Sequence, residues 1–357
     1  MSRIDKFLEL VAKQHGSDLH LVSGNPPRIR LYGELLPVEY RELDNEEVAD
    51  LIYQTMTDAV RKAFERRWNL DYAYEVGGLA RFRVNAFHHL GGLGAVFRVI
   101  RTNIRTLDEL GMPPVLKTLC KQKRGLILVT GPTGSGKSTT LAAMVDFINN
   151  DRKEHIITIE DPVEFVHTQK KCLISQREIG LNVDSFAAAL RSSLREDANV
   201  VLVGELRDLE TIGLAVTAAE TGLLVLATLH TSGAAATVDR MVSVFPAGEQ
   251  MLIRSMLATS LCGVVSQQLV RRADGKGMVA AVEVLVNNAA VSNILREGKT
   301  DLLTSVIQSG ALVGMQTLDS ALRRLMDAKL ITGGEAYRKA ANKAAFEQFR
   351  ERDEETA

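Results

Sequence analysis

The sequence predicts an α/β protein built from two domains, and three observations support this fold class. At 357 residues, the chain has room for two domains of ordinary size. Residues 80–87 alternate strictly between apolar and polar types, as does an antiparallel strand with one buried face. From residue 113 onward, apolar runs alternate with helical patterns, which is typical of a parallel sheet with helical crossovers.

The composition is that of an ordinary globular protein. Apolar residues make up 46% of the chain and charged residues 24%. The net charge of -1 gives no broad basic field, so we expect no nucleic acid partner and no direct binding to an anionic membrane. The three cysteines form no C-x-x-C pair, so neither a zinc site nor a disulfide framework is predicted. Finding no export signal and no membrane-spanning stretch, we expect a cytoplasmic protein.

The first domain, residues 1–100, is expected to combine helices with antiparallel strands. Its helical patterns cover residues 4–14 and 45–64, and the second of these ranges is long enough for two helices. In the alternating strand, Arg81 and Arg83 share the face opposite the apolar side chains. These two arginines are therefore free to take part in a functional contact.

A change of pattern marks the expected domain boundary. Residues 101–112 lead into a Pro-Pro pair and are expected to form a linker. The second domain then covers residues 113–357. Its last residues, 351–357, are polar and are expected to fray.

The strongest functional signal lies at residues 131–139, which match the phosphate-binding pattern G-x-x-x-x-G-K-[ST]. An apolar run precedes this segment and a helical stretch follows it, which is the setting that a triphosphate requires. Lys137 would neutralise charge on the β- and γ-phosphates, and Ser138 would offer its hydroxyl to Mg²⁺. The expected nucleotide-binding residues are Gly131, Pro132, Thr133, Gly134, Ser135, Gly136, Lys137, Ser138 and Thr139.

Polar side chains also follow three further apolar runs, at the strand ends where open α/β sheets bind ligands. They are Glu160 and Glu164 after residues 155–159, Glu205 after residues 200–203, and His230 after residues 223–229. Because the carboxyl ends of parallel strands lie at one edge of a sheet, we expect these groups to form one catalytic rim with the phosphate-binding loop.

The rim supplies the groups that hydrolysis of a nucleoside triphosphate needs. Glu205 is suited to hold Mg²⁺ directly or through water, since this ion prefers oxygen ligands. A second carboxylate must orient or deprotonate the attacking water, and Glu164 is the first candidate and Glu160 the second. Any one of these acids could instead only cap a helix or pair with an arginine. Asp161, which precedes a proline, is better suited to form a turn.

A further helix is predicted over residues 184–196, with Asp184 or Ser185 as its N-cap. It carries Arg191 and Arg195 four residues apart, on one face. These arginines could reach the nucleotide or the carboxylates, but structural pairing is the favoured interpretation.

In combination, these motifs resemble the PilT-type ATPases of type IV pilus systems, within the secretion-ATPase superfamily that includes GspE/PulE-like proteins. The resemblance extends from about Ile4 to Ile331. Besides the phosphate-binding loop, it is carried by residues 17–21, 80–87, 158–164, 190–197, 201–208, 228–231 and 314–319. Three of these segments, in this order, are highly specific together: the Asp box at 158–164, the Walker B-like segment at 201–208 with its unusual Gly-Glu ending, and the His box at 228–231.

The resemblance implies a PAS-like N-terminal domain, a RecA-like P-loop ATPase domain and a homohexamer that hydrolyses ATP with Mg²⁺. It places ATP between one ATPase domain and a neighbour's N-terminal domain, where Arg81, Arg83 and Arg98 match nucleotide-sensing arginines. It also implies a motor at the cytoplasmic face of the inner membrane. This motor would power pilus retraction and twitching motility by acting on an inner-membrane platform protein.

Two departures from the family pattern bear on this interpretation. Leu223 follows Thr221-Gly222 at a position where the family usually has a histidine. In the C-terminal motif of the PilT subgroup, at residues 290–297, Ser292 replaces a basic residue. The second departure weakens the prediction of a retraction motor more than it weakens the prediction of an ATPase.

The sequence is compatible with three alternative functions. The chain could be an accessory paralogue of the retraction motor, a pilus-assembly or secretion ATPase, or a scaffold that binds ATP without hydrolysing it. Assembly ATPases typically carry a longer N-terminal region and a tetracysteine zinc insert, neither of which occurs in this sequence. The presence of Lys137, Glu164 and Glu205 argues against the scaffold.

Overall fold

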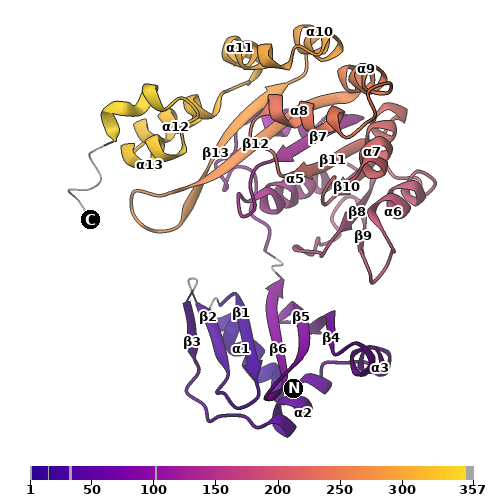
Figure 1. The fold of residues 1–357 in the computed structure, drawn as a ribbon, viewed down its shortest axis with the longest axis vertical. Helices are drawn as coiled ribbons and strands as arrows, with labels where there is room; N and C mark the ends of the chain where they lie inside the picture. The colour runs from indigo at the N-terminus through magenta and orange to yellow at the C-terminus, as the bar shows by residue number, and fades with distance from the viewer. Residues whose placement is uncertain (1, 15, 32–33, 101–102, 351–357) are drawn as a thin grey trace. The chain divides into compact units, whose positions relative to one another are not determined.

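The computed structural model describes residues 2–14, 16–31, 34–100 and 103–350, and the chain divides into two compact units (Figure 1). The first unit holds the residues up to Asn103 together with Glu164–Val166, and the second holds the rest of the described chain from Ile104 onward. The expected frayed tail at 351–357 and the linker residues 101 and 102 lie outside the described residues. Within the described ranges, no helix is both long enough and apolar enough to cross a membrane.

The first unit is a six-stranded sheet of order β3-β2-β1-β6-β5-β4, accompanied by three helices. All the neighbouring strands in this sheet pair antiparallel. The elements are α1 (Arg3–Lys13), β1 (Asp18–Val22), β2 (Arg28–Leu31), β3 (Glu34–Pro37), α2 (Asn45–Tyr53), α3 (Asp58–Arg67), β4 (Asn69–Val76), β5 (Ala80–His89) and β6 (Gly92–Ile100).

Local chemistry explains the main elements of this unit. Helix α1 begins at a capping box in which Ser2 and Asp5 bond each other's backbone N–H groups, and α2 begins with the same device. Strand β5 has the burial pattern that its sequence predicts, because Phe82 and Val84 are buried whereas Arg81 and Arg83 are partly exposed.

The second unit is built on a seven-stranded sheet of order β13-β12-β7-β11-β10-β8-β9. The six strands from β12 to β9 are parallel, and β13 pairs antiparallel with β12 at one edge. The strands are β7 (Gly125–Thr130), β8 (His155–Glu160), β9 (Leu173–Glu178), β10 (Val200–Val203), β11 (Leu224–Leu229), β12 (Leu261–Arg271) and β13 (Met278–Val286). The predicted α/β fold class, with a parallel sheet in the second half, is confirmed.

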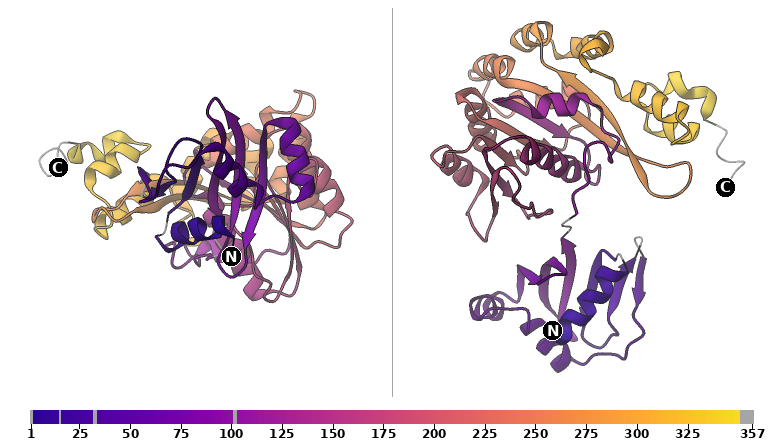
Figure 2. Two further views of the ribbon diagram at one scale, coloured as in Figure 1. Left: turned by 90° about the horizontal axis from the view of Figure 1, so that it is seen from below. Right: turned by 180° about the vertical axis from the view of Figure 1, so that it is seen from behind.

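Helices cover both faces of this sheet (Figure 2), which explains why its strands are continuous apolar runs. Leu126 and Leu128 of β7 pack on the face of α7, whereas Ile127 and Val129 pack on the face of α5. The helices are α4 (Val115–Cys120), α5 (Lys137–Asp151), α6 (Phe186–Ser193), α7 (Leu209–Thr221), α8 (Ala234–Ser243), α9 (Gln250–Ser260), α10 (Ala289–Glu297), α11 (Leu303–Ser309), α12 (Leu318–Asp327) and α13 (Gly333–Lys339), with short 3₁₀ helices at 300–302, 311–313 and 343–349.

Residues 104–112, which the sequence suggests as a linker, pack within the second unit. Leu107 and Met112 are buried in the same core cluster as Leu116 of α4. Lys117 of that helix also forms an ion pair with Asp108 at 2.6 Å. The sequence signal for this burial was a pair of apolar side chains five residues apart. The Pro-Pro pair that follows them indicates a linker instead.

The motif at residues 314–319 has a structural role in this fold. Gln316 forms a backbone bridge with Val284 of β13, and Thr317 caps α12. The Asp319 carboxylate accepts hydrogen bonds from the backbone N–H groups of residues 341 and 342. These contacts hold the C-terminal helices, in which Phe346 is completely buried.

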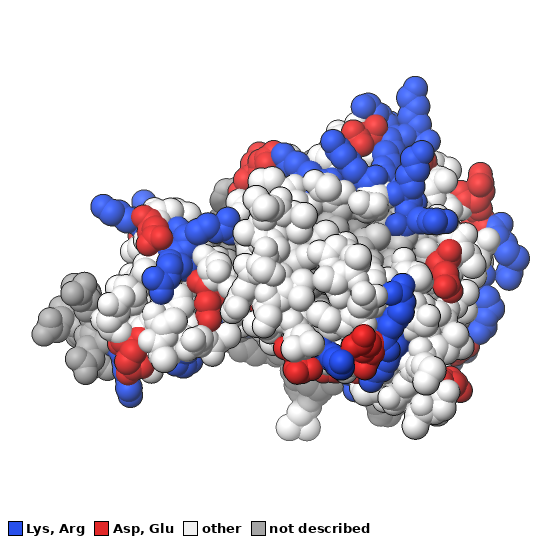
Figure 3. Space-filling view, turned by 90° about the horizontal axis from the view of Figure 1, so that it is seen from above, with Lys and Arg blue, Asp and Glu red and all other residues white. Residues whose placement is uncertain are grey.

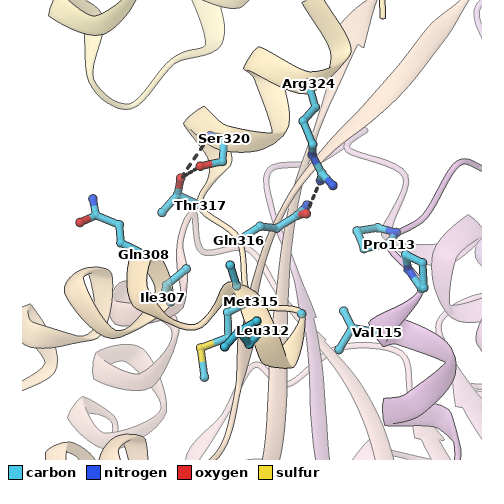
Figure 4. Close-up of a pocket in the computed structure, with 13 residues that line it drawn as sticks. Pro113, Val115, Ile307, Gln308, Leu312, Met315, Gln316, Thr317, Ser320 and Arg324 are labelled. Atoms are coloured by element: carbon cyan, nitrogen blue, oxygen red, sulfur yellow. Dashed lines mark hydrogen bonds between the residues drawn. The ribbon is translucent and has the colours of Figure 1, made fainter. Parts of the chain in front are cut away.

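A pocket of about 430 Å³ lies beside this motif (Figure 4). Pro113 and Val115 line one part of it, and Met315 and Gln316 line another. Arg324 donates a hydrogen bond to the side chain of Gln316 at its rim. The pocket contains none of the predicted nucleotide-binding residues, so it is separate from the predicted active site.

Candidate active site

The phosphate-binding loop connects β7 to α5, as the sequence predicts. Gly131 and Gly136 have φ angles of 141° and 87°, a region that L side chains rarely adopt, and Gly136 is the residue that caps α5. A Cβ atom on Gly131 would lie 2.2 Å from the backbone oxygen of Gln267, so a side chain cannot be accommodated there. The hydroxyl of Ser135 is buried in this loop without a hydrogen-bond partner.

Lys137 begins helix α5 and folds back over the loop. Its Nζ donates hydrogen bonds to the carbonyl oxygens of Gly131 at 2.9 Å and Pro132 at 3.1 Å, and it lies 3.4 Å from Nδ1 of His230. The residue is only 8% exposed. A phosphate would offer this ammonium group stronger, charge-assisted bonds in place of those to the carbonyls.

Glu205 and His230 lie at the edge of the sheet where the loop begins, because β11 lies between β7 and β10. The Nε2 atom of His230 is 3.3 Å from a Glu205 carboxylate oxygen, and its Nδ1 atom is 3.4 Å from the Thr133 hydroxyl. A continuous chain of contacts therefore runs from the phosphate-binding loop through His230 to Glu205.

The surroundings of Glu205 keep its carboxylate ionised. Burial opposes ionisation, but a hydrogen bond from Arg207 and the nearby His230 outweigh it, so the pKa of Glu205 lies below its ordinary value. The guanidinium of Arg207 is 2.8 Å from the carboxylate, and this bond raises the pKa of Arg207. Sequence reasoning missed Arg207, although its position two residues after the glutamate was a usable signal.

The donor atoms at this edge suit Mg²⁺. Ser138 offers a hydroxyl in the first turn of α5, and Glu205 offers an ionised carboxylate. No group of three or more His, Cys, Asp or Glu side chains in the described part of the chain could hold a metal ion alone. A sparse set of oxygen donors fits an ion that keeps several waters and binds substrate phosphates.

The two candidate bases differ in their surroundings. A carboxylate oxygen of Glu160 accepts hydrogen bonds from the Thr158 hydroxyl at 2.7 Å and from the Gln176 amide at 3.2 Å. Glu164 follows in the loop after β8, and its side chain is exposed. The structure thus engages Glu160 in contacts within β8 and β9, and leaves Glu164 accessible to solvent.

Two of the three predicted site arginines of the first unit, Arg83 and Arg98, form ion pairs inside that unit. Arg83 lies 3.4 Å from Asp71, and Arg98 lies 2.8 Å from the buried Asp18. Arg83 and Arg98 are also cross-strand neighbours on β5 and β6, and Arg81 is partly exposed.

Of the two arginines in the α6 region, Arg191 has the structural pairing that the sequence favours. Ser185 caps α6, and Arg191 forms an ion pair with Glu210 on the neighbouring helix α7. Arg195 is exposed, just beyond the C-terminal end of α6.

A phosphate-binding loop and an adjacent Glu–His pair, at the carboxyl edge of a mainly parallel sheet, define a RecA-like P-loop nucleotide hydrolase. The model of the family "Type II/IV secretion system protein" matches residues 1–344. The chain therefore belongs to this family, and it is a secretion-type ATPase.

Individual relatives narrow the comparison. The type IV pilus retraction ATPase PilT of Pseudomonas aeruginosa is 52% identical over 94% of this chain and 98% of its own length. The type IV pilus ATPase PilU of the same bacterium is 40% identical over 90% of this chain and 84% of its own length. A crystal structure of the pilus retraction motor PilT with bound ADP has a TM-score of 0.91 and 40% identity, covering 98% of this chain and 99% of that one. The chain is thus similar to PilT-type ATPases along nearly its whole length.

Replacing Gly131 by alanine should abolish nucleotide binding. The new Cβ would overlap the backbone oxygen of Gln267, so the loop must move to relieve the clash. ADP should raise the melting temperature of the wild-type protein but not that of Gly131→Ala. Gly180→Ala is the matched control, because Gly180 also has a positive φ angle but has open space around it. If ADP raised the melting temperature of Gly131→Ala as much as that of the wild type, the assignment of the nucleotide site to this loop would be wrong.

Proposed function

We propose that this chain is a homohexameric, Mg²⁺-dependent ATPase that powers type IV pilus retraction and hence twitching motility. The observation that carries the proposal is the chain of contacts from the phosphate-binding loop through His230 to Glu205. It occurs in a chain that is 52% identical to a pilus retraction ATPase over 98% of that relative's length.

Each group at the site has a role in this proposal. The backbone N–H groups of residues 131–139 bind the phosphates of ATP, and Lys137 neutralises the charge that develops during transfer. Ser138 and Glu205 would hold Mg²⁺, directly or through water, and the ion would supply charge stabilisation on the phosphates. Glu164 orients and deprotonates the attacking water, because it is an acid accessible to solvent after β8. His230 positions Glu205 against the loop.

In the proposed motor, ATP hydrolysis deforms the hexameric ring. Arg81, Arg83 and Arg98 sense the nucleotide bound to a neighbouring subunit, and each hydrolysis event shifts one N-terminal domain against the next ATPase domain. The resulting deformation acts on an inner-membrane platform protein from the cytoplasmic side, and pilin subunits are removed from the pilus base. The proposed division of the chain places residues 1–100 in the moving domain and residues 113–357 in the ATPase domain.

The comparisons favour a retraction motor. Identity is 52% to the retraction ATPase PilT and 40% to the ATPase PilU, over similar shares of this chain. The ionised Glu205 and the buried Lys137 also favour a hydrolysing enzyme over a passive scaffold.

Glu164→Gln should bind ATP and hydrolyse it at a rate at least about 100-fold below wild type, because an amide cannot take a proton from water. Glu160→Gln should retain most activity, since an amide oxygen still accepts the hydrogen bonds from Thr158 and Gln176. Phosphate release by the two variants, with ATP binding measured in parallel, distinguishes the bases. Near-normal turnover by Glu164→Gln together with an inactive Glu160→Gln would reverse the assignment.

Helix α10, which carries the C-terminal motif, is the proposed output element. Val291 and Leu295 are buried, so the helix is anchored to the core. Ser292, at the departure from the family motif, donates a hydrogen bond to the Ala258 carbonyl of α9 at 2.8 Å and therefore has a structural role. Asn293 and Arg296 bond each other on the exposed side. Seen from above, the middle of the surface is largely uncharged, with charged side chains of both signs toward its margins (Figure 3).

Replacing Asn293 and Arg296 by alanine should preserve the hexamer and most ATPase activity but abolish twitching. The apolar anchors stay in place, so only the exposed contact surface is lost. ATPase assays, size measurement in solution and a twitching assay in cells test this separation. Arg67→Ala, which also removes an exposed helical arginine, is the control and should leave twitching intact. Unaffected twitching in the α10 variant would contradict an output role, and joint loss of assembly and ATPase activity would make the helix part of the core.

A further inference from the structure

The side chain of Gln267 on β12 connects two parts of the nucleotide site. It is 1% exposed, and both ends of its amide are hydrogen-bonded. The Nε2 atom donates to the backbone oxygen of Ser135 in the phosphate-binding loop at 2.6 Å, and the Oε1 atom accepts from the Thr140 hydroxyl in the first turn of α5 at 2.9 Å. One buried amide thus binds the loop and the helix that follows it.

The pairing of β12 with β7 brings this residue to the loop. Ser266 is in register with Thr130, the last residue of β7. Gln267 and Gly131, which follow these two residues, therefore lie next to each other. The backbone oxygen of Gln267 occupies the space that a side chain on Gly131 would need. Backbone and side chain of Gln267 therefore bound the loop at both of its ends.

The same hairpin holds the segment that follows His230. The Ser266 hydroxyl accepts a hydrogen bond from the Gly233 N–H at 2.8 Å, and the Glu283 carboxylate of β13 accepts one from the Ala234 N–H at 2.8 Å. Ser266 and Glu283 are cross-strand partners. The β12–β13 hairpin therefore contacts both the phosphate-binding loop and the start of α8.

The bond to Ser135 has a consequence for the direction of the next amide. In a trans peptide the C=O of one residue and the N–H of the next point in opposite directions. With the Ser135 carbonyl held toward β12, the Gly136 N–H must point away from β12. Backbone N–H groups at this position of the loop are the ones that bind phosphate oxygens.

We propose that Gln267 is a positioning residue for the phosphate-binding loop: it fixes the Ser135–Gly136 peptide in the orientation that binds nucleotide phosphates. Packing alone does not need a polar side chain at a site as buried as this one. Without the amide, the Ser135 carbonyl and the Thr140 hydroxyl would lose their partners in a buried place, and the peptide would be free to rotate. The inference rests on nucleotide binding by this loop, as proposed above, and not on the direction of pilus movement.

The first test is equilibrium binding of fluorescent ADP to the full-length protein. Gln267→Met keeps the length of the side chain but removes both hydrogen bonds, and it should weaken ADP binding by about 5- to 100-fold. Gln268→Met is the matched control, because the neighbouring glutamine is partly exposed and alternates to the other side of β12. Circular dichroism confirms that each variant is folded.

A second variant tests the hydrogen bond rather than the packing. In Gln267→Glu, a protonated carboxyl can still donate to the Ser135 carbonyl and accept from Thr140, whereas an ionised carboxylate faces that carbonyl with no proton. Burial raises the pKa of a carboxyl in such a place. ADP affinity of this variant, relative to wild type at the same pH, should therefore improve as the pH falls from about 8 to about 6.

The outcomes separate the two proposals. Wild-type ADP affinity in Gln267→Met, or a relative affinity of Gln267→Glu that does not change with pH, would overturn the role of Gln267. If Gln267→Met fails to fold, the pH series decides the question, with Thr140→Val as a milder variant that keeps the bond to Ser135. Failure of the wild-type protein to bind ADP would instead contradict the proposed function.

Discussion

The site depends on one constraint of the parallel sheet, which is that the carboxyl ends of its strands lie at one edge. Because β11 lies between β7 and β10, the loop with Lys137, the imidazole of His230 and the carboxylate of Glu205 become neighbours although they are far apart in sequence. The strands that end at this edge are buried on both faces of the sheet. Their apolar side chains alternate between the two layers of helices that cover it. The chemistry of the site is thus a consequence of strand order.

The sequence predicted the parts of this arrangement that depend on local pattern. The loop at 131–139 has glycines where the backbone needs positive φ, and alternation in residues 80–87 assigned Phe82 and Arg83 to opposite faces. The apolar runs located β8, β10 and β11 to within one residue. Because strand ends carry the polar groups, locating the strands also located Glu205 and His230.

The sequence could not predict contacts that depend on long-range pairing. Gln267 lies more than 100 residues from the loop that it holds, and only the register of β12 against β7 brings the two together. Leu107 precedes a Pro-Pro pair that suggests a linker, and Phe346 lies in a polar segment, yet both are buried. Leu107 packs against elements that follow it in the chain, and Phe346 packs against elements that precede it. In the sequence, Ser292 replaces a basic residue of the family motif. In the structure, its hydroxyl donates a hydrogen bond to a backbone carbonyl of α9.

Whether ATP turnover at this edge of the sheet drives pilus retraction is best measured in the bacterium that carries the gene. Deleting the gene and counting surface pili together with twitching should give excess surface pili without movement. The wild-type gene should restore both properties, whereas Lys137→Ala should not, because it lacks the charge that stabilises phosphoryl transfer. Deletion that leaves bald cells would point to pilus assembly, and rescue by Lys137→Ala would contradict a motor driven by this site.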